Sequence, residues 1–296
     1  MPLSIRPIDP VNRAFFAGEV EGIDLSRPAA PEDIAAIVAG MDKFAVLVFH
    51  DQRLDDEQQL AFSRHFGPLE TADADIRRPE DRRLKPQIAD ISNLGKDDRI
   101  LEREDRRRLF SLGNMLWHSD SSFKPTPAKY SLLHARIIPG KGGNTEFADM
   151  RAAWDALDDE LKAECKDLVC MHSQIYSRGQ LGFSEFTEEE RARNRPVPQR
   201  LVRLHPGSQR RSLFLSAHAG EIVGWPVPEA RAFLRDLTEH ATQRRFVYAH
   251  EWRVGDLVMW DNRAVMHRAR RYDPREVREL HRTTVADCAP TLEQAA

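Results

Sequence analysis

The sequence predicts a mainly β protein that carries helices on its outside. Most of its apolar residues fall into short runs, which is typical of buried strands. Glycine, proline and aspartate residues between these runs indicate turns, and only a few helical stretches interrupt the series. Many short strands joined by such turns favour an antiparallel sandwich or jelly roll with helices packed against it.

The N-terminal part contains two expected helices with one strand between them. The stretch "PEDIAAIVAGMDK" begins with Pro31, a residue favoured in the first helical turn, and carries acidic residues near its start. The apolar run Phe44 to Phe49 then predicts a buried strand. The stretch "LDDEQQLAFSRHFG" stops at Gly67 and has an apolar pattern that predicts a second helix.

The rest of the chain begins with a polar stretch and continues with strands and helices. Thr71 to Gln87 shows no periodicity, so we expect a mobile loop there, and a lid over a site is one role for it. Further strands are expected in "IADISNL", "AKYSLLHARII", "LVCMHSQIY", "RLVRLH", "SLFLSA", "RRFVYAHEW", "DLVMW" and "LHRTTVA". Helices are expected at Met150 to Lys166, Thr187 to Asn194 and Pro228 to Thr242.

Length and composition limit the class of protein. The 296 residues are enough for one large domain or two small ones. Because neither an internal repeat nor a low-complexity linker divides the chain, we expect a single domain over residues 1–296. The net charge of −3 gives no support to binding of nucleic acid or of a membrane surface, since either would need a basic excess.

The expected location is the cytoplasm. The three cysteines are widely spaced, and they indicate neither a disulfide framework nor a zinc–thiolate site. The first residues, "MPLSIRPIDPVNR", lack the apolar core of a signal peptide. No apolar run approaches the roughly 20 residues that a membrane-spanning helix needs.

A histidine and an aspartate two residues apart are the first candidate for chemistry. In "GNMLWHSDSSF", His118 and Asp120 would point to the same face of a strand, with Cα atoms about 6–7 Å apart, and could converge on one ion. With 11 histidines in the chain, about one such pair is expected by chance, so an ordinary polar patch is an equal alternative.

A third candidate ligand follows an apolar strand near the C-terminus. In "DLVMWDNRAVMHRARRYD", His267 is placed to complete a set of two histidines and one carboxylate. Such a triad leaves coordination positions open and is diagnostic of non-haem Fe(II) oxygenases, whereas structural zinc is closed by four ligands. A structural histidine is the alternative.

Two arginines in "VRELHRTTV" indicate anion binding. Arg278 and Arg282 share one face of the predicted strand, roughly 13 Å apart. Guanidinium groups on an inward face are costly unless each meets an anion, and arginine binds carboxylates with two parallel hydrogen bonds. A surface strand with ordinary ion pairs is the alternative. With the candidate iron ligands, the two arginines imply a dicarboxylate co-substrate and a second anion.

With these residues in hand, the chain resembles the taurine dioxygenase / 2,4-dichlorophenoxyacetate dioxygenase family of Fe(II)- and 2-oxoglutarate-dependent enzymes. The resemblance runs nearly end to end and is strongest to the alpha-type members of the herbicide-degrading branch. The segments that carry it are "EVEGIDLSRP", "AFSRHFGPLE", "ISNLGKD", "LFSLGNMLWHSDSSF", "GGNTEFADMRAAWDAL", "SRGQLGFSEFT", "HPGSQRRSLFLSAHA", "EHATQRRFVY" and "GDLVMWDNRAVMHRARRYD".

The resemblance implies a double-stranded β-helix, the jelly roll of cupin-like proteins, and a set of cofactors. His118, Asp120 and His267 would bind Fe(II) and so be catalytic. Thr145, in "GGNT", and Arg278 would hold the distal carboxylate of 2-oxoglutarate, and O2 would be the second co-substrate.

The prime substrate implied by the resemblance is a small organic anion. Arg282 would contact its anionic group, and Asn114 matches a polar asparagine on the substrate side. Taurine enzymes carry a histidine and a tyrosine shortly after "FGxL", whereas this chain reads "FGPLETADADIRR", which favours a carboxylate over taurine. Lys85 is either a further cation for that carboxylate or a solvated side chain. The roles of His205 and His218 stay open between the site and the structure.

The expected reaction is cleavage of an aryloxyacetate ether such as that of 2,4-dichlorophenoxyacetate. Hydroxylation beside the ether oxygen would give a hemiacetal that collapses to a phenol and glyoxylate, while 2-oxoglutarate yields succinate and CO2. Hydroxylation of an alkyl sulfonate, a sulfate ester or an acylated amino acid is the alternative within enzymes. A non-catalytic cupin-like binding protein is the alternative outside them. Self-association into a homo-oligomer is compatible with the family.

Overall fold

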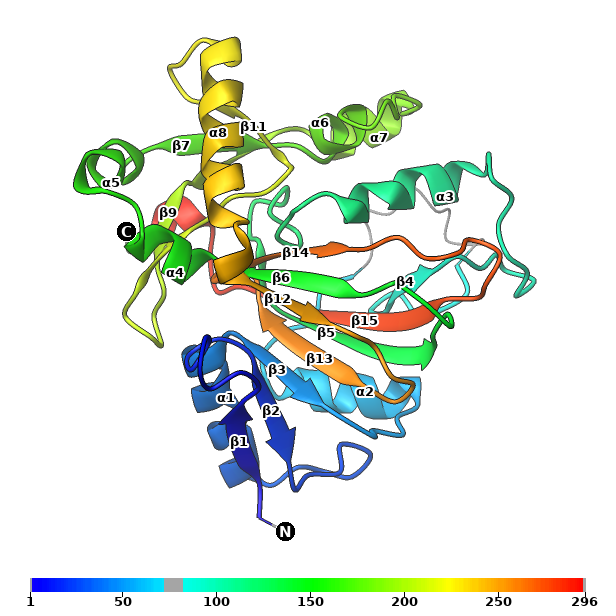
Figure 1. The fold of residues 1–296 in the computed structure, drawn as a ribbon. Coiled ribbons are helices and arrows are strands. Elements are labelled where there is room, and N and C mark those ends of the chain that lie inside the picture. Colours follow the sequence, from blue (N-terminus) through cyan, green and yellow to red (C-terminus); the bar gives the residue numbers. More distant parts are fainter. Residues whose placement is uncertain (1, 72–81, 295–296) are drawn as a thin grey trace.

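The computed structural model describes residues 2–71 and 82–294, which fold into sheets with helices outside them (Figure 1). The strands are β1 (Ser4–Pro7), β2 (Gly18–Glu21), β3 (Val46–Phe49), β4 (Ala89–Ser92), β5 (Ala128–Ile137), β6 (Thr145–Asp149), β7 (Val169–His172), β8 (Val197–Arg200), β9 (Val202–Leu204), β10 (Arg211–Leu213), β11 (Ala219–Ile222), β12 (Val247–His250), β13 (Leu257–Asp261), β14 (Val265–Ala269) and β15 (Glu279–Ala286). The α-helices are α1 (Pro31–Phe44), α2 (Asp56–Arg64), α3 (Arg106–Ser111), α4 (Met150–Asp155), α5 (Asp159–Cys165), α6 (Gln174–Gly179), α7 (Glu188–Arg193) and α8 (Val227–Ala241). Short 3-10 helices are η2 (Leu112–Met115), η3 (Arg244–Phe246) and η4 (Thr291–Glu293).

Two sheets pack face to face and form the centre of the molecule. The larger has the strand order β1-β2-β3-β13-β5-β15-β4, and the smaller has the order β12-β6-β14. Leu133 of β5 and Val258 of β13 belong to one buried apolar cluster with Phe147 of β6 and Val265 of β14. The two sheets therefore share a core, and β14 and β6 lie beside β15 and β5 in Figure 1.

Helices cover the outer face of the larger sheet. Ile37 and Met41 of α1 and Phe62 of α2 pack with Leu47 of β3 and Met259 of β13. Helix α1 carries acidic residues in its first turn and Lys43 in its last, which suits the helix dipole. In α2 the Asp55 side chain accepts from the backbone N–H of Gln58, and the side chain of Gln58 returns the bond, so a capping box fixes its start.

A second layer of helices covers the outer face of the smaller sheet. Ala148 of β6 and Met266 of β14 share a buried cluster with Trp154 of α4 and with Leu234 and Leu237 of α8. Packing on both faces explains why β6 and β14 are buried along most of their length. The smaller sheet is thus held between the larger sheet and α4 and α8.

Most of the expected elements are confirmed, but several segments differ from the expectation. The strand in "SLFLSA" ends at Leu213, and "RRFVYAHEW" begins with the 3-10 helix η3 before β12. Met150 to Lys166 forms two helices rather than one, because the side chain of Asp158 caps the start of α5. The expected strand in "LVCMHSQIY" ends at His172, and Ser173 caps helix α6 by accepting from the backbone N–H of Tyr176.

The expected loop from Thr71 to Gln87 falls largely outside the described residues, since these omit 72–81. Residues 82–87 contain neither helix nor strand. Arg83 ties this segment to the larger sheet through ion pairs to Asp90 at 3.2 Å and Glu279 at 2.7 Å. Among the described residues, no helix combines the length and apolar character that crossing a membrane requires.

Candidate metal centre and substrate cavity

His118, Asp120 and His267 meet in one buried cluster. One ligand atom from each lies within 4.8 Å of the others, and the two histidine ring centroids are 4.2 Å apart. His118 follows η2 and pairs with His267 of β14 in an isolated bridge, in which each backbone N–H donates to the other residue's carbonyl at 3.0 and 2.8 Å. The expectation of a strand at His118 is therefore correct for one residue only, because Asp120 already lies in a turn.

The two histidine rings are oriented by different means. Nδ1 of His118 lies 2.7 Å from the carbonyl oxygen of Leu116, so the proton belongs on Nδ1 and Nε2 is left with a lone pair. The His267 ring packs against Phe147 and Trp260, with ring centroids 6.1 and 4.7 Å away. Nε2 of His118 and Nε2 of His267 lie 3.8 and 3.7 Å from the two carboxylate oxygens of Asp120.

Asp120 is held by three neighbours, of which the sequence pattern singled out Arg282 but neither Ser131 nor Asn262. Ser131 of β5 donates to Oδ2 at 2.7 Å, and Nη1 of Arg282 donates to Oδ1 at 2.5 Å. The side-chain oxygen of Asn262 accepts from the backbone N–H of Asp120 at 2.9 Å, while its amide nitrogen donates to Ser131 at 3.0 Å. Ser131 and Asn262 lie in the segments "AKYSLLHARII" and "WDNR", but neither pattern gave these two residues a role.

The charge of this cluster suits a divalent cation. Burial lowers the pKa of His118 and of His267, so both rings are neutral near pH 7. Burial alone would raise the pKa of Asp120, but Arg282 and the two histidines outweigh it and lower that pKa to about 2. Two neutral imidazoles and one carboxylate are the donor set of a facial Fe(II) site. His118, Asp120 and His267 therefore fit the metal expected from the sequence.

Arg278 and Thr145 form the candidate anion clamp. Arg278 precedes β15, is 5% exposed, and donates from Nη2 to the carbonyl oxygen of Gly143 at 3.1 Å. No carboxylate among residues 2–71 and 82–294 forms an ion pair with it, and burial lowers its pKa to about 10. Thr145, two residues after Gly143, accepts from Nε1 of Trp252 at 3.0 Å. A buried guanidinium without a carboxylate partner fits the distal carboxylate of 2-oxoglutarate.

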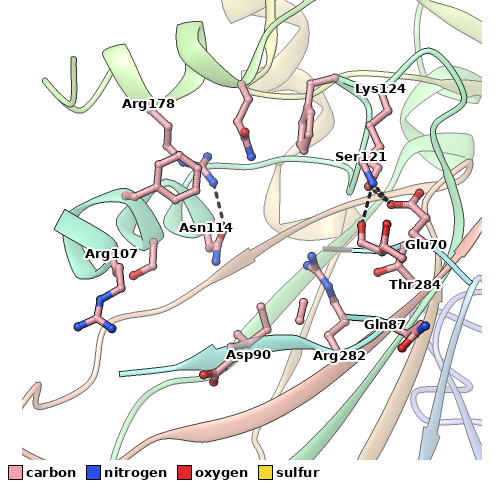
Figure 2. A pocket seen from close by; sticks show the side chains of 17 residues that line it. Glu70, Gln87, Asp90, Arg107, Asn114, Ser121, Lys124, Arg178, Arg282 and Thr284 are labelled. Carbon is pink, nitrogen blue, oxygen red and sulfur yellow. Dashed lines mark hydrogen bonds and ion pairs between the residues drawn. The ribbon is translucent and has the colours of Figure 1, made fainter. Parts of the chain in front are cut away.

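A cavity of about 130 Å³ contains the two residues predicted on the substrate side (Figure 2). Asn114 of η2 and Arg282 of β15 both line it, and Phe110, Phe123 and Ile91 provide apolar wall. The candidate metal ligands, Thr145 and Arg278 do not line the cavity. Arg282 connects the two regions, because it faces the cavity and also binds Asp120.

Arg178 of α6 is a cavity residue that the sequence analysis missed. Its Nη2 donates to the side-chain oxygen of Asn114 at 3.4 Å, a contact drawn in Figure 2. Its guanidinium carbon lies 4.5 Å from the centre of the Phe110 ring. The resemblance included the segment "SRGQLGFSEFT", but a resemblance of the segment gave no role to its arginine.

The three residues with open roles lie in different surroundings. His205 is fully buried and its Nε2 lies 2.8 Å from Oδ2 of Asp261, so it forms a structural hydrogen bond. His218 is also buried, and its ring packs against His118 and Phe123 with centroids 6.1 and 4.8 Å away. Lys85 is exposed and pairs with Glu57, so it contributes no cation to the cavity.

Comparison with known proteins gives one consistent family. A profile described as "Taurine catabolism dioxygenase TauD, TfdA family" matches residues 4–284. The chain is 46% identical over 289 residues to an alpha-ketoglutarate-dependent 2,4-dichlorophenoxyacetate dioxygenase of Cupriavidus pinatubonensis, covering 98% of this chain and 99% of the relative. It is 36% identical to an (S)-phenoxypropionate/alpha-ketoglutarate-dioxygenase of Sphingobium herbicidovorans, covering 95% and 94%. The crystal structure of AAD-2 in complex with Mn(II) and N-oxalylglycine superimposes with a TM-score of 0.95 at 55% identity, covering 98% and 100%.

Proposed function

The chain belongs to the taurine catabolism dioxygenase TauD, TfdA family, and we propose that it is an Fe(II)- and 2-oxoglutarate-dependent dioxygenase that cleaves the ether bond of aryloxyacetates. The observation that carries this proposal is the buried cluster of His118, Asp120 and His267, which offers two neutral nitrogens and one carboxylate. The relatives named for 2,4-dichlorophenoxyacetate and phenoxypropionate support an aryloxyacetate such as 2,4-dichlorophenoxyacetate as the prime substrate.

In this function the side chains of the site have separate tasks. His118, Asp120 and His267 hold the iron and leave its remaining positions to the co-substrates. Arg278 and the hydroxyl of Thr145 bind the distal carboxylate of 2-oxoglutarate, which supplies the anion that the buried guanidinium otherwise lacks. Arg282 and Asn114 bind the anionic end of the prime substrate in the cavity.

The reaction outcome follows from which C–H bond the site presents. When bound, Fe(II), 2-oxoglutarate and O2 supply the oxidant that converts a C–H bond to C–OH while 2-oxoglutarate becomes succinate and CO2. For an aryloxyacetate, hydroxylation of the carbon between the ether oxygen and the carboxylate gives a hemiacetal. That hemiacetal loses the phenol and leaves glyoxylate. The protein contributes orientation of this carbon and a cavity lined partly by apolar side chains.

A second candidate function is oxidation of another small anion. An alkylsulfatase of Acinetobacter baylyi and an alpha-ketoglutarate-dependent sulfate ester dioxygenase of Pseudomonas putida are each 26% identical to this chain. Alkyl sulfonates, sulfate esters and acylated amino acids are therefore the substrates to test against aryloxyacetates. The lower identity of these relatives, and the absence from "FGPLETADADIRR" of the histidine and tyrosine found in taurine enzymes, favour a carboxylate.

A co-substrate-coupled panel tests the proposal. The Fe(II) protein with 2-oxoglutarate and O2 is offered aryloxyacetates, alkyl sulfonates, sulfate esters and acylated amino acids, and succinate, phenol and glyoxylate are measured. We expect equal amounts of succinate, phenol and glyoxylate from the aryloxyacetates. Succinate release that rises with a sulfonate or sulfate ester but not with any aryloxyacetate would transfer the proposal to the second candidate. His118→Ala and Asp120→Ala are expected to abolish turnover with the fold intact.

We further propose the finer architecture and setting of the chain. The shared core between the two sheets and the likeness to AAD-2 support a double-stranded β-helix of the cupin-like jelly-roll type in one domain over residues 1–296. A single cooperative unfolding transition would test the single domain. The three cysteines are free, which supports a reducing cytoplasm. Self-association stays a prediction that light scattering can test.

A further inference from the structure

Thr145 begins strand β6, and its backbone is fixed by the neighbouring strands. Strand β6 lies between β12 and β14 (Figure 1), and Thr145 is opposite His250 of β12 and Ala269 of β14. Just before it, the backbone N–H of Gly143 donates to the carbonyl oxygen of Arg271 at 3.1 Å. With the backbone held in this way, the direction in which Thr145 offers a hydrogen bond depends on the contacts of its side chain.

The hydroxyl of Thr145 contacts a group that can only donate. Nε1 of Trp252 lies 3.0 Å from Oγ1, and an indole N–H has no acceptor capacity. Oγ1 therefore accepts this bond, and the hydroxyl proton is left for another acceptor. Among residues 2–71 and 82–294 no acceptor for that proton is found. Since Thr145 is only 3% exposed, bulk water reaches it poorly as well.

Trp252 is itself held in place by a series of polar groups. It is buried, and its ring meets that of His250 at right angles with centroids 4.7 Å apart. Nδ1 of His250 lies 3.0 Å from the hydroxyl of Tyr248, and Nε2 lies 3.0 Å from Oδ2 of Asp256. Burial raises the pKa of Tyr248, so the phenol keeps its proton and donates it to Nδ1. The proton of His250 then belongs on Nε2, facing Asp256.

The other member of the candidate anion clamp has an unused donor beside this segment. Nε of Arg278 is buried and has no hydrogen-bond partner among the described residues. A Cβ atom added at Gly143 would lie 3.1 Å from that Nε, so the arginine lies directly against the segment that leads into Thr145. A buried N–H and a buried O–H both need an acceptor, and one carboxylate has lone pairs for both.

We propose that Trp252 is a positioning residue for 2-oxoglutarate, whose indole N–H occupies the acceptor side of the Thr145 hydroxyl and so turns its proton toward the distal carboxylate at Arg278. The inference rests on the proposed function, because it assigns how that site recognises its co-substrate. Trp252 acts through Thr145 rather than by binding the co-substrate. Without the indole N–H, the hydroxyl is free to rotate and part of the preference for a distal carboxylate is lost.

The test measures that preference directly. The Mn(II)-loaded protein is titrated with 2-oxoglutarate and with 2-oxopentanoate, which has the same chain length but a methyl group in place of the distal carboxylate. The rise in unfolding temperature with ligand concentration gives each dissociation constant, and their ratio is the preference. We expect W252F to lower the preference ~5-fold or more, by weakening 2-oxoglutarate while 2-oxopentanoate changes by less than about twofold.

A second cycle tests the hydrogen bond between Trp252 and Thr145. T145V removes the hydroxyl and should weaken 2-oxoglutarate ~10-fold or more, and the double variant W252F/T145V should weaken it no further. T145V also leaves a buried indole N–H without an acceptor, so its unfolding temperature without ligand should fall. The double variant should recover part of that fall, because neither partner is then left unpaired.

W260F is the matched control. Trp260 is also buried, and its Nε1 donates to the side-chain oxygen of Asn262 at 3.1 Å. The same substitution therefore removes a buried indole hydrogen bond that serves the surroundings of Asp120 rather than the clamp. At saturating Mn(II), W260F should keep the wild-type preference for 2-oxoglutarate over 2-oxopentanoate.

The outcomes distinguish this inference from the proposed function. If wild-type protein does not bind 2-oxoglutarate, the proposed function fails first and the inference fails with it. If wild-type protein prefers 2-oxoglutarate but W252F keeps that preference, or loses affinity equally for both ligands, Trp252 only packs and the inference is wrong. Where 2-oxopentanoate binds too weakly to titrate, additive losses in W252F and T145V would overturn the inference. Benzothienylalanine at position 252, an indole isostere with sulfur in place of the N–H, keeps the test decisive if W252F is unstable.

Discussion

Replacing Arg278 with methionine should leave the protein without 2-oxoglutarate at least as stable as the wild type, while binding of 2-oxoglutarate is lost. The reason is that Arg278 is buried beside Gly143 and Tyr272 with no ion pair to a described carboxylate. Holding a charge there without its anion costs free energy, and methionine fills a similar volume without charge.

The magnitude follows from the pKa of Arg278. Burial lowers this pKa to about 10, against roughly 12.5 for an exposed arginine, and each unit corresponds to about 1.36 kcal/mol, so the cost is ~3 kcal/mol. Because the folded-state pKa is the lower one, this cost is fully present below about pH 10 and is relieved only as the pH rises above it. Methionine also loses the hydrogen bond to the Gly143 carbonyl, which costs ~1–3 kcal/mol and offsets part of the stability gained by removing the charge.

Thermal unfolding with and without 2-oxoglutarate measures both effects, with Mn(II) in place of iron to prevent turnover. Arg278→Met should unfold at the wild-type temperature or a few degrees above it, and its half-saturation by 2-oxoglutarate should rise ~100-fold or more. Arg151→Met is the matched control, because Arg151 is equally buried but pairs with Asp149 at 3.3 Å. That variant should lose ~3–5 kcal/mol of stability and keep its affinity for 2-oxoglutarate. A strongly destabilised Arg278→Met with unchanged 2-oxoglutarate affinity would refute the anion clamp.

Three further predictions follow, two from the neighbours of the candidate metal ligands and one from the buried His172 of β7. Ser131→Ala removes the donor to Oδ2 of Asp120 and should weaken binding of Mn(II) or Fe(II) ~10-fold, as measured by metal titration. Arg282→Met removes the group that contributes most to lowering the pKa of Asp120. As the pH is lowered, Asp120 should therefore take up a proton, and metal affinity should fall, at a higher pH than in wild type. Identical pH profiles would contradict this. Burial lowers the pKa of His172 to about 3, so at pH 5 its ring is neutral in the folded state. In the unfolded state the same ring takes up a proton below about pH 6.5. His172→Phe keeps the stacking on Phe214. The difference in free energy of unfolding between this variant and wild type, measured by denaturant unfolding, should therefore be ~2 kcal/mol more favourable to the variant at pH 5 than at pH 8.

The fold could be predicted where local pattern and burial agree. Helices α1 and α8 have a proline in their first turn and an apolar stripe, and their observed bounds lie within two residues of those expected. Strand β6 was not predicted, because its partners β12 and β14 are about a hundred residues away in the sequence. Its identity as a strand depends on these distant pairings, which no local window contains.

The same distinction between local pattern and distant pairing applies to the residues of the candidate site. His118, Asp120 and His267 could be selected because ligand chemistry restricts the residue types and spacing. Ser131 could not, since serine is common and only the pairing of β5 with β13 brings it beside Asn262 and Asp120. Arg178 is a similar case, because its position depends on how α6 packs against α3 and η2.

From the sequence, Arg278 is expected to bind 2-oxoglutarate and Arg282 the prime substrate, and the surroundings of the two guanidinium groups differ as well. Arg278 is buried without a carboxylate among the described residues, so binding of a dicarboxylate relieves a cost that the protein already carries. Arg282 is already paired with Asp120, so a substrate anion that approaches it must share its charge with a metal ligand. Recognition of the prime substrate by Arg282 alone would therefore weaken the hold on Asp120 at the moment of binding.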